Sequence, residues 1–179
     1  MNAIVSLLDP EHDRRVRELW GELESAAAVR HIVELIPHPH ITYHGAEKYD
    51  VARLVPLLEQ LARGARPFTA TTVGMGVFTG QLPVLHLAIA RNPALAAFHA
   101  QLWQVVGPTA SDPSHYYNAG MWAPHITLAQ WDVTPQNLPR LAGVLAERNL
   151  EWELPLGNIA LVQFNGERYD VTHRFPFGA

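Results

Sequence analysis

The sequence predicts an α+β fold built from two related lobes. The tetrapeptide Pro-His-Ile-Thr occurs twice, at 39–42 and 124–127. Segments with strand-like and helix-like apolar patterns alternate along the chain. No flexible linker or low-complexity tract divides it into separate domains. These observations favour one compact domain that contains an internal repeat.

The repeat extends beyond the four identical residues, which alone would be weak as a repeat signal. Each copy is followed by a strand, a helix and two further strands, in the same order. His40 precedes Gly80 by 40 residues, and His125 precedes Gly166 by 41. A strand and a helix also precede each copy. We therefore infer a single two-lobed domain over 1–179, made of duplicated units over roughly 1–82 and 83–179, with terminal strands that can be exchanged between the lobes.

Capping residues and apolar spacing define the elements of the first unit. Asp9 and Pro10 suit the N-cap and the first position of a helix, and apolar residues follow at helical spacing as far as Leu23. Asp50 caps a second helix in the same way. The predicted elements are a strand at 2–8, a helix at 10–28, a strand at 40–45 with a turn at Gly45, a helix from 51 to about Gly64, and a strand at 67–80 whose glycines indicate a bend or bulge.

The second unit carries similar punctuation. Asn92 and Pro93 open a helix that Gly107 and Pro108 end, and Thr134 with Pro135 opens the last helix. The predicted elements are a strand at 83–90, a helix at 93–106, a long loop at 108–120, a strand at 124–131, a helix from about 135, and strand-like segments at 151–164 and 169–177.

Composition excludes several classes of function. The chain has no cysteine, which excludes disulfides, thiolate catalysis and cysteine-based zinc sites. Thirteen Lys and Arg against seventeen Asp and Glu give a net charge of −4, without the cationic footprint that DNA or long RNA needs. No apolar run is long enough to cross a bilayer, and the start lacks the basic region of a signal peptide. We expect a cytoplasmic monomer that binds neither DNA nor a membrane.

Two of the ten histidines lie in the repeated tetrapeptide. Residues i and i+2 of a strand point to the same side, so His40 shares a face with Thr42, and His125 with Thr127. The isoleucines between them point the other way and anchor the strands in the core. A twofold relation between the lobes would bring both pairs to one point. There, one neutral and one protonated histidine could act as base and acid on a phosphodiester, with the hydroxyls donating to its oxygens.

Two His-x-Thr motifs on strands, 85 residues apart, resemble the two-histidine phosphoesterase superfamily. That group includes bacterial 2′-5′ RNA ligases and RNA 2′,3′-cyclic phosphodiesterases. The resemblance spans nearly the whole chain, from the opening strand and helix to the last strand. It implies a bilobal fold of two antiparallel sheets with outer helices and a central cleft. It also implies hydrolysis of a cyclic phosphate on a small nucleotide or RNA terminus, with no metal and no cofactor.

Carried over by position, the resemblance makes His40 and His125 the catalytic pair, and Thr42 and Thr127 the phosphate-binding hydroxyls. Which histidine is acid and which is base depends on how the substrate lies. The scarcity of basic residues favours small cyclic phosphates over long RNA. Two alternatives stay open. One is 2′-5′ RNA ligation, the reverse reaction, and the other is a module that binds a nucleotide or RNA end without catalysis.

Other side chains could contact the substrate. His44 has the strand parity of His40, and aromatic side chains could stack on a base. For each of them, ordinary packing or a surface position is the alternative. These candidate substrate contacts are His44, Phe78, Trp122 and Phe164.

Further histidines and arginines have open roles. The repeat places His86 and His173 on equivalent late strands, where they could line the cleft or lie in the core. His38 and His40 are close enough to share a metal ion, but no third ligand follows at suitable spacing. Arg91, Arg168 and Arg174 could reach a phosphate, and nothing in the sequence selects among them.

Overall fold

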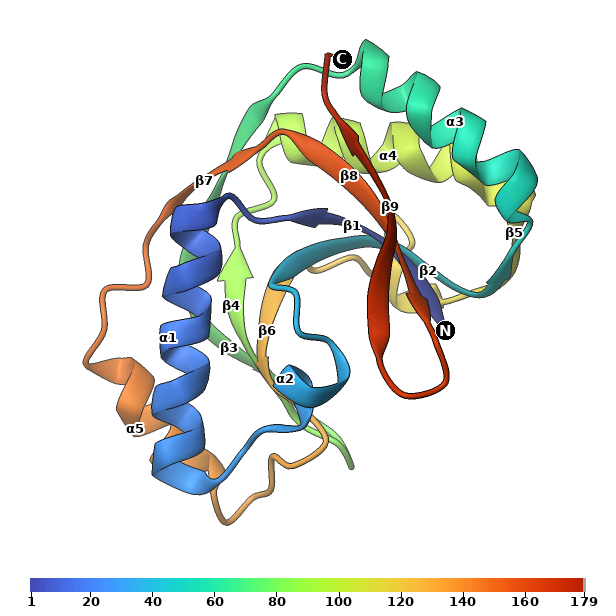
Figure 1. Cartoon of the computed structure of the whole chain (residues 1–179). Helices are drawn as coiled ribbons and strands as arrows, with labels where there is room; N and C mark the ends of the chain where they lie inside the picture. The colour runs from blue at the N-terminus through green and yellow to red at the C-terminus, as the bar shows by residue number, and fades with distance from the viewer. Residues whose placement is uncertain (179) are drawn as a thin grey trace.

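Two antiparallel sheets form the framework of the protein, as Figure 1 shows for this computed structural model, which describes residues 1–178. The first sheet has the order β5 (Ala110–Pro113), β2 (His40–Tyr49), β1 (Asn2–Leu7), β8 (Asn158–Phe164), β9 (Tyr169–Pro176). The second has the order β6 (His125–Ala129), β4 (Val84–Ile89), β3 (Phe68–Phe78), β7 (Glu153–Leu156). The expected α+β class with two antiparallel sheets is confirmed.

The long helices cover one side of each sheet (Figure 1). Strands of the first sheet contact α3 (Val51–Gly64) and α4 (Pro93–Val106). The second is covered by α1 (Pro10–Ala27), which contacts β6, and by α5 (Leu138–Ala146), which packs on α1. Three short helical segments complete the chain: α2 (His31–Leu35), η1 (Gly107–Thr109) and η2 (His115–Tyr117). Most buried apolar side chains of both lobes form one large core, and Val5, Ala160 and Val162 form a second, small cluster.

Each half of the chain contributes at least one strand to the sheet of the other half. β3, from the first half, lies beside β4, while β8, from the second half, lies beside β1. Corresponding hydrogen bonds join the sheets to the repeated tetrapeptides: Leu8 N–H donates to the Pro39 carbonyl at 3.4 Å, and Ile89 N–H to the Pro124 carbonyl at 3.0 Å. Two duplicated units with exchanged terminal strands would produce this arrangement. The duplication itself stays our inference.

Several predicted local features are confirmed. Asp9 Oδ1 accepts a hydrogen bond from the N–H of Glu11 at 3.0 Å, and Asn92 Oδ1 accepts one from the N–H of Leu95 at 2.9 Å, so both residues cap their helices. The register between β3 and β4 shifts near Gly74, whose φ of 104° favours glycine. The expected bulge in this strand is therefore present.

Other boundaries differ from the prediction. β2 continues through Gly45 without a turn, and the expected loop after α4 contains strand β5, which pairs with β2. The strand-like segment 151–164 is broken at Gly157 into β7 and β8, which belong to different sheets. α5 begins only at Leu138, because Thr134 and Asn137 first form a turn in which each side chain accepts from the other's backbone N–H.

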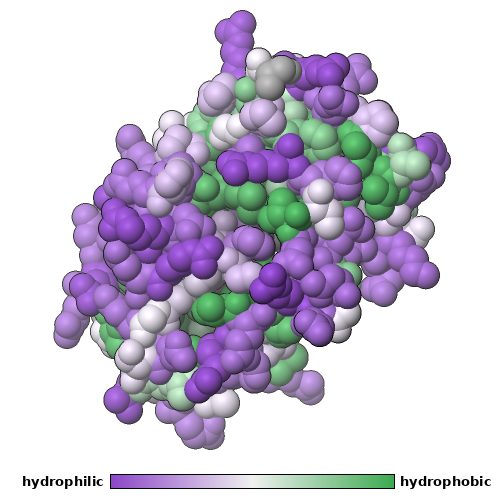
Figure 2. Space-filling model, in the orientation of Figure 1, coloured by the Kyte–Doolittle hydropathy of each residue, from purple (hydrophilic) through white to green (hydrophobic). Residues whose placement is uncertain are grey.

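The surface carries polar side chains with apolar areas between them. The face drawn in Figure 2 is mostly hydrophilic, with hydrophobic patches between the charged groups. Among residues 1–178, no helix is long and apolar enough to cross a membrane.

Candidate active site

The two His-Thr pairs meet where β2 and β6 pass each other. Cα atoms of these strands come within 8 Å, and the charge of His125 is close enough to lower the pKa of His40. The residues that alternate with the pairs are buried, since Ile41 and Ile126 have no exposed surface. Strand parity then places the four polar side chains between the lobes: His40, Thr42, His125 and Thr127.

Each histidine is held by the same local hydrogen bond. Nδ1 of His40 donates to the carbonyl of His38 at 2.6 Å, and Nδ1 of His125 donates to the carbonyl of Ala123 at 2.8 Å. A carbonyl can only accept, so Nδ1 carries the hydrogen and Nε2 is free to take or give a proton. The proline between the paired residues keeps the preceding residue extended. The Pro-His part of the repeated tetrapeptide thus supports one tautomer in both copies.

Burial keeps the two imidazoles neutral in the free protein. It lowers the pKa of His40 to about 4, and the nearby His125 acts in the same direction, while the bond to the carbonyl of His38 opposes the shift. Burial also lowers the pKa of His125, against its bond to Ala123. An anion between the rings would favour a protonated imidazole. The site is therefore suited to take up a proton when a phosphate binds.

Two indole groups tie the threonines across the lobes. Nε1 of Trp122, just before β6, donates to the carbonyl of Thr42 at 2.8 Å, and Nε1 of Trp20, on α1, donates to the carbonyl of Thr127 at 3.3 Å. Trp122 is only 3% exposed and stacks on His99 with 3.8 Å between ring centroids. The expectation that Trp122 contacts the substrate is therefore wrong, because its ring lies in the core and supports β2 from behind.

His44 does not share the face of Thr42. The pairing of β2 with β1 is irregular at this point, where Tyr43 is an extra residue in β2. Such a bulge reverses the side on which the following residues point. His44 is fully buried, its Nδ1 is hydrogen bonded to the hydroxyl of Tyr49 at 2.5 Å, and its ring lies 4.3 Å from that of Trp103. The expectation of a substrate contact at His44 is wrong.

Two of the aromatic residues expected to contact the substrate lie on the inner side of the sheets, which is the side that carries the His-Thr pairs. Phe78, 37% exposed, stands edge-on to His125 at 4.9 Å and covers His86 at 4.1 Å, measured between ring centroids. Phe164, 47% exposed, is four residues along β8 from Ala160, which is level with Thr42. Strand geometry makes that separation about 13 Å. Phe78 can meet the part of a substrate next to the phosphate, whereas Phe164 can meet only a distant part.

His86 and His173 are not equivalent. β4 lies inside the second sheet, between β6 and β3, while β9 is the edge of the first. His86 faces the inner side, with its ring centroid 5.1 Å from that of His125. His173 points to the other side and stacks at 6.3 Å on Phe175, which packs against the core. Only His86 lines the cleft.

Tyr117 is a site residue that the sequence analysis missed. Its ring lies on the inner side of β2, where a Cβ on Gly45 would come 2.9 Å from its Cε2. Burial raises the pKa of Tyr117, and a hydrogen bond with the side chain of Thr42 opposes this shift. Glycine inside a strand often marks the close approach of another group. Gly45 was therefore the residue in the sequence that could have indicated a close neighbour, although we predicted a turn there instead.

Of the three candidate arginines, Arg174 faces the cleft. Arg91 donates to a backbone carbonyl at 2.7 Å, and Arg168 forms an ion pair with Asp170 at 3.0 Å. Arg174 lies opposite Ala160 in the first sheet, in the same row of neighbouring residues as Thr42. Its side chain therefore points to the inner side of the sheet, as that of Thr42 does. Within residues 1–178, Arg174 makes no hydrogen bond or ion pair through its side chain. It is therefore available to bind an anion.

His38 and His40 are not arranged as a pair of metal ligands. Nδ1 of His40 is occupied by the carbonyl of His38. In the described part of the chain, no group of three or more His, Asp or Glu side chains is arranged to hold a metal ion.

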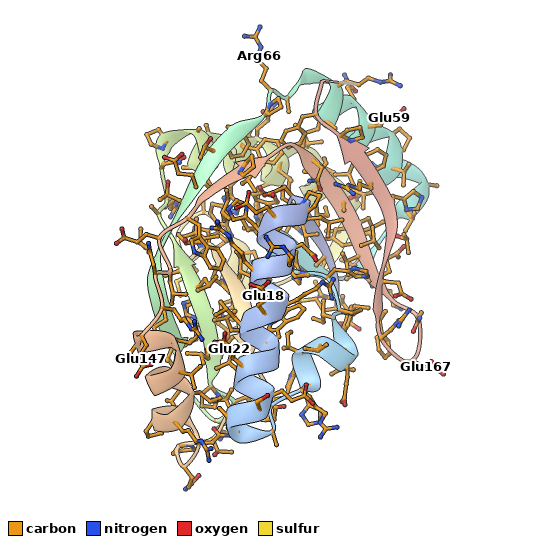
Figure 3. The ribbon with its side chains drawn as sticks, turned by 60° about the vertical axis from the view of Figure 1, so that its left-hand side comes forward. Glu18, Glu22, Glu59, Arg66, Glu147 and Glu167 are labelled. Atoms are coloured by element: carbon orange, nitrogen blue, oxygen red, sulfur yellow. The ribbon has the colours of Figure 1, made fainter. Side chains whose placement is uncertain are left out.

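A separate hollow of about 410 Å³ lies on the outer side of the second sheet, between α1 and segment 148–152. Glu18 and Glu22, labelled in Figure 3, line it from α1. Arg148 forms an ion pair with Glu22 at 2.8 Å across this hollow. Arg15 and Glu18, which also line it, form ion pairs with Glu11 and Arg14 of α1. The inner cleft is therefore the better candidate for an active site.

Comparison with known families agrees with this geometry. A family model described as the 2′-5′ RNA ligase superfamily matches residues 8–168. The chain belongs to this superfamily. A search of curated protein sequences found no match.

Solved structures share the fold of this superfamily member over its full length. TT0787 of Thermus thermophilus is 20% identical, with a TM-score of 0.64 and 99% of this chain and 98% of that chain covered. LigT of E. coli complexed with 3′-AMP is 15% identical, with a TM-score of 0.60 and coverage of 99% and 98%. Usb1 of Kluyveromyces marxianus is 9% identical, with a TM-score of 0.50 and coverage of 98% and 97%. The resemblance to two-histidine phosphoesterases is confirmed at the level of family and fold.

Proposed function

We propose that this protein is a metal-independent phosphodiesterase that opens 2′,3′-cyclic phosphates on small nucleotides or RNA ends. The observation that carries this proposal is the matched anchoring of His40 and His125, each with Nδ1 on a backbone carbonyl and Nε2 free. Membership of the 2′-5′ RNA ligase superfamily supports phosphodiester chemistry. Structures of E. coli LigT with 3′-AMP, ATP and NADP⁺ support a ligand of nucleotide size.

Hydrolysis requires one proton to be removed and another to be delivered. A neutral imidazole takes a proton from the water that attacks phosphorus, and a protonated imidazole gives its proton to the departing ribose oxygen. One P–O bond forms and one breaks, which yields a 2′- or 3′-phosphate monoester. The two rings exchange protonation states, and proton transfer through solvent restores them. The hydroxyls of Thr42 and Thr127 donate to the non-bridging oxygens.

The inner side offers further contacts for such a substrate. Phe78 stands next to His125 and can stack on a base attached to the cyclic phosphate. Tyr117 reaches the side chain of Thr42, at the edge of the phosphate position. Arg174, whose side chain has no partner within residues 1–178, is a cation on the same side of the first sheet. A net charge of −4 favours a small ligand over a long RNA.

Turnover of 2′,3′-cyclic AMP by single variants tests this proposal. His40→Ala and His125→Ala are each expected to lower kcat by about 100-fold or more, because each removes a proton-transfer group. His173→Ala is the matched control, because His173 points away from the cleft and its loss should leave kcat unchanged. Addition of a chelator should not reduce turnover. Full activity in either cleft variant, or loss of activity with chelator, would contradict the proposal.

An aryl phosphodiester assigns the acid and the base. A 4-nitrophenolate leaving group needs no proton, so the variant that lacks the acid should regain turnover on this substrate, while the variant that lacks the base should stay inactive. Equal inactivity of His40→Ala and His125→Ala on the aryl ester would contradict the division of tasks between them.

A 2′-5′ RNA ligase activity is the second candidate, favoured by the name of the matching family. A 5′-hydroxyl would replace water as the nucleophile, and the same residues would serve. Incubation of an oligoribonucleotide ending in a 2′,3′-cyclic phosphate with a 5′-hydroxyl oligonucleotide distinguishes joined product from monoester. Binding of 3′-AMP without turnover of either substrate would instead identify a binding module.

A further inference from the structure

A third histidine makes the two sides of the cleft different. In the second sheet, Thr127 lies opposite His86, and His86 lies opposite Gly76. The corresponding row of the first sheet is Thr42, Val5 and Ala160. Counted from the threonine in each row, His86 corresponds to Val5. In the same way, Gly76 corresponds to Ala160.

His86 fits a notch that only glycine leaves open. A Cβ on Gly76 would lie 2.5 Å from Nε2 of His86, closer than real atoms approach. Nδ1 of His86 donates to the carbonyl of Val84 at 3.2 Å, which fixes the ring from behind. The Phe78 ring covers it almost in parallel, with 22° between the planes and 4.1 Å between the centroids. His86 is enclosed between these groups and is only 5% exposed.

The rings of His86 and Phe78 both contact His125. The ring centroids of His86 and His125 are 5.1 Å apart, and Phe78 meets His125 edge-on, at 81° and 4.9 Å. Aromatic rings attract one another at such separations and angles. Val5 and Ala160 offer no ring to His40. The stack of Gly76, His86 and Phe78 therefore restrains only one of the two histidines.

We propose that His86 is a positioning residue that, together with Phe78, fixes the ring of His125 and makes it inequivalent to His40. His86 does not transfer the proton itself, because Phe78 covers it and its Nδ1 is occupied. This inference rests on the proposed function for its kinetic consequences. The geometry on which it stands, the notch and the three contacting rings, does not depend on the substrate.

The residues that face His86 from the neighbouring strands determine its protonation state. β6 contributes His125 and Thr127, and β3 contributes Gly76 and Phe78, so His125 is the titratable group among them. Burial lowers the pKa of His86 to about 4, and the charge of His125 acts in the same direction. His86 is therefore neutral at neutral pH, and it acts on His125 by contact and by excluding water.

A double-mutant cycle tests the notch. His86→Val and Gly76→Ala are each expected to lower kcat by about tenfold, because each displaces a ring that positions His125. In the His86→Val background the notch is empty, so the second substitution should change kcat by less than about twofold. The double variant has the Val-Ala row of the other lobe. Gly157→Ala is the control, since its nearest neighbour is 4.0 Å away. Equal damage by Gly76→Ala in both backgrounds would overturn the proposal.

Titration of the histidines by NMR gives a test that needs no substrate. In His86→Val, the smaller side chain lets water reach the His125 ring, so the pKa of His125 should rise while that of His40 stays constant. Unchanged titration of His125 would overturn the positioning role, even if the protein hydrolyses cyclic phosphates. A shift of His125 in a protein that hydrolyses none would sink the proposed function and keep the positioning role.

His86→Phe separates packing from proton transfer. Phenylalanine keeps a ring between Gly76 and Phe78 but has no nitrogen. If His86 positions His125 by contact, His86→Phe should be clearly more active than His86→Val, and its His125 should titrate closer to the wild-type pKa. If both variants are as inactive as His125→Ala, then His86 takes part in proton transfer and the proposal fails. A variant that does not fold is recognised by its NMR spectrum, and Gly76→Ala then supplies the perturbation of the ring.

Discussion

Replacement of Trp122 by phenylalanine tests whether β2, the strand that carries Thr42, is held from the opposite half of the chain. The indole Nε1 donates to the carbonyl of Thr42 at 2.8 Å, and Trp122 is 3% exposed. Phenylalanine can keep the stacking on His99 but leaves this carbonyl without its partner. A buried polar group left unpaired costs about 1–3 kcal/mol. The folding equilibrium constant should therefore fall by a factor of about 5 to 150.

Trp103→Phe controls for the loss of ring volume. Nε1 of Trp103 donates to the carbonyl of Tyr43 at 2.9 Å, so this variant loses an equivalent bond to the residue after Thr42. Urea unfolding should show a loss of stability in both variants. Trp122→Phe should also lower kcat on the cyclic phosphate by about tenfold, because a small displacement of a positioning group has an effect of that size. Trp103→Phe should affect kcat much less.

Equal losses of turnover in the two variants would refute the idea that the indole of Trp122 positions Thr42. An unchanged urea midpoint in Trp122→Phe would refute the energetic argument itself. Trp20→Phe provides an independent check in the other lobe. Its bond to the carbonyl of Thr127 is longer, at 3.3 Å, so the expected loss is at the low end, about 1 kcal/mol.

Two further predictions concern pH and Tyr117. Burial lowers the pKa of His44 to about 4 from the ordinary value of 6.5. The unfolded chain binds more protons between these values, so the free energy of unfolding should decrease as the pH is lowered across this range, by about 1.4 kcal/mol per unit. His40 and His86 also have lowered pKa values, so His44→Gln should reduce the loss of stability between about pH 7 and about pH 5 by the share of His44 alone, as measured by urea titration. Tyr117→Phe removes the hydroxyl that meets Thr42 and should lower kcat by about tenfold with the fold retained.

Each of these predictions has a clear contrary result. If wild type and His44→Gln lose stability equally on acidification, then His44 titrates normally in the folded protein. For Tyr117, the control is Tyr116→Phe, which changes a neighbouring tyrosine that is 65% exposed in the same turn. Unchanged turnover in Tyr117→Phe as well as in Tyr116→Phe would mean that the Tyr117 hydroxyl plays no part at the phosphate.

Features determined by neighbours along the chain were predictable. The caps at Asp9 and Asn92 depend on residues two or three positions away, and their helices begin where expected. The alternation within the repeated tetrapeptide likewise buries Ile41 and Ile126 and leaves the His-Thr pairs on the inner side. The local pattern was therefore sufficient to select the four central residues of the candidate site.

Features determined by pairing between distant segments were not predictable in this way. His44 has the right parity in the sequence, but the extra residue at Tyr43 appears only when β2 is paired with β1. Trp122 is buried because its indole meets Thr42, which lies 80 residues away. The same holds for the loop after α4, where β5 forms only because β2 offers it a free edge. In each case the local pattern was compatible with the wrong answer.

The glycines inside the strands connect the fold to the chemistry. Gly45 and Gly76 lie on the inner sides of the two sheets, and a Cβ at either would collide with an aromatic ring, that of Tyr117 or that of His86. The first ring reaches Thr42, the proposed phosphate-binding threonine, while the second contacts His125, one of the two proposed catalytic histidines. The inferred duplication would place two identical His-Thr pairs, yet the proposed hydrolysis needs a base on the side of the water and an acid on the side of the departing ribose. The two notches admit different rings beside otherwise equivalent pairs. They therefore supply the difference that a twofold arrangement alone would lack.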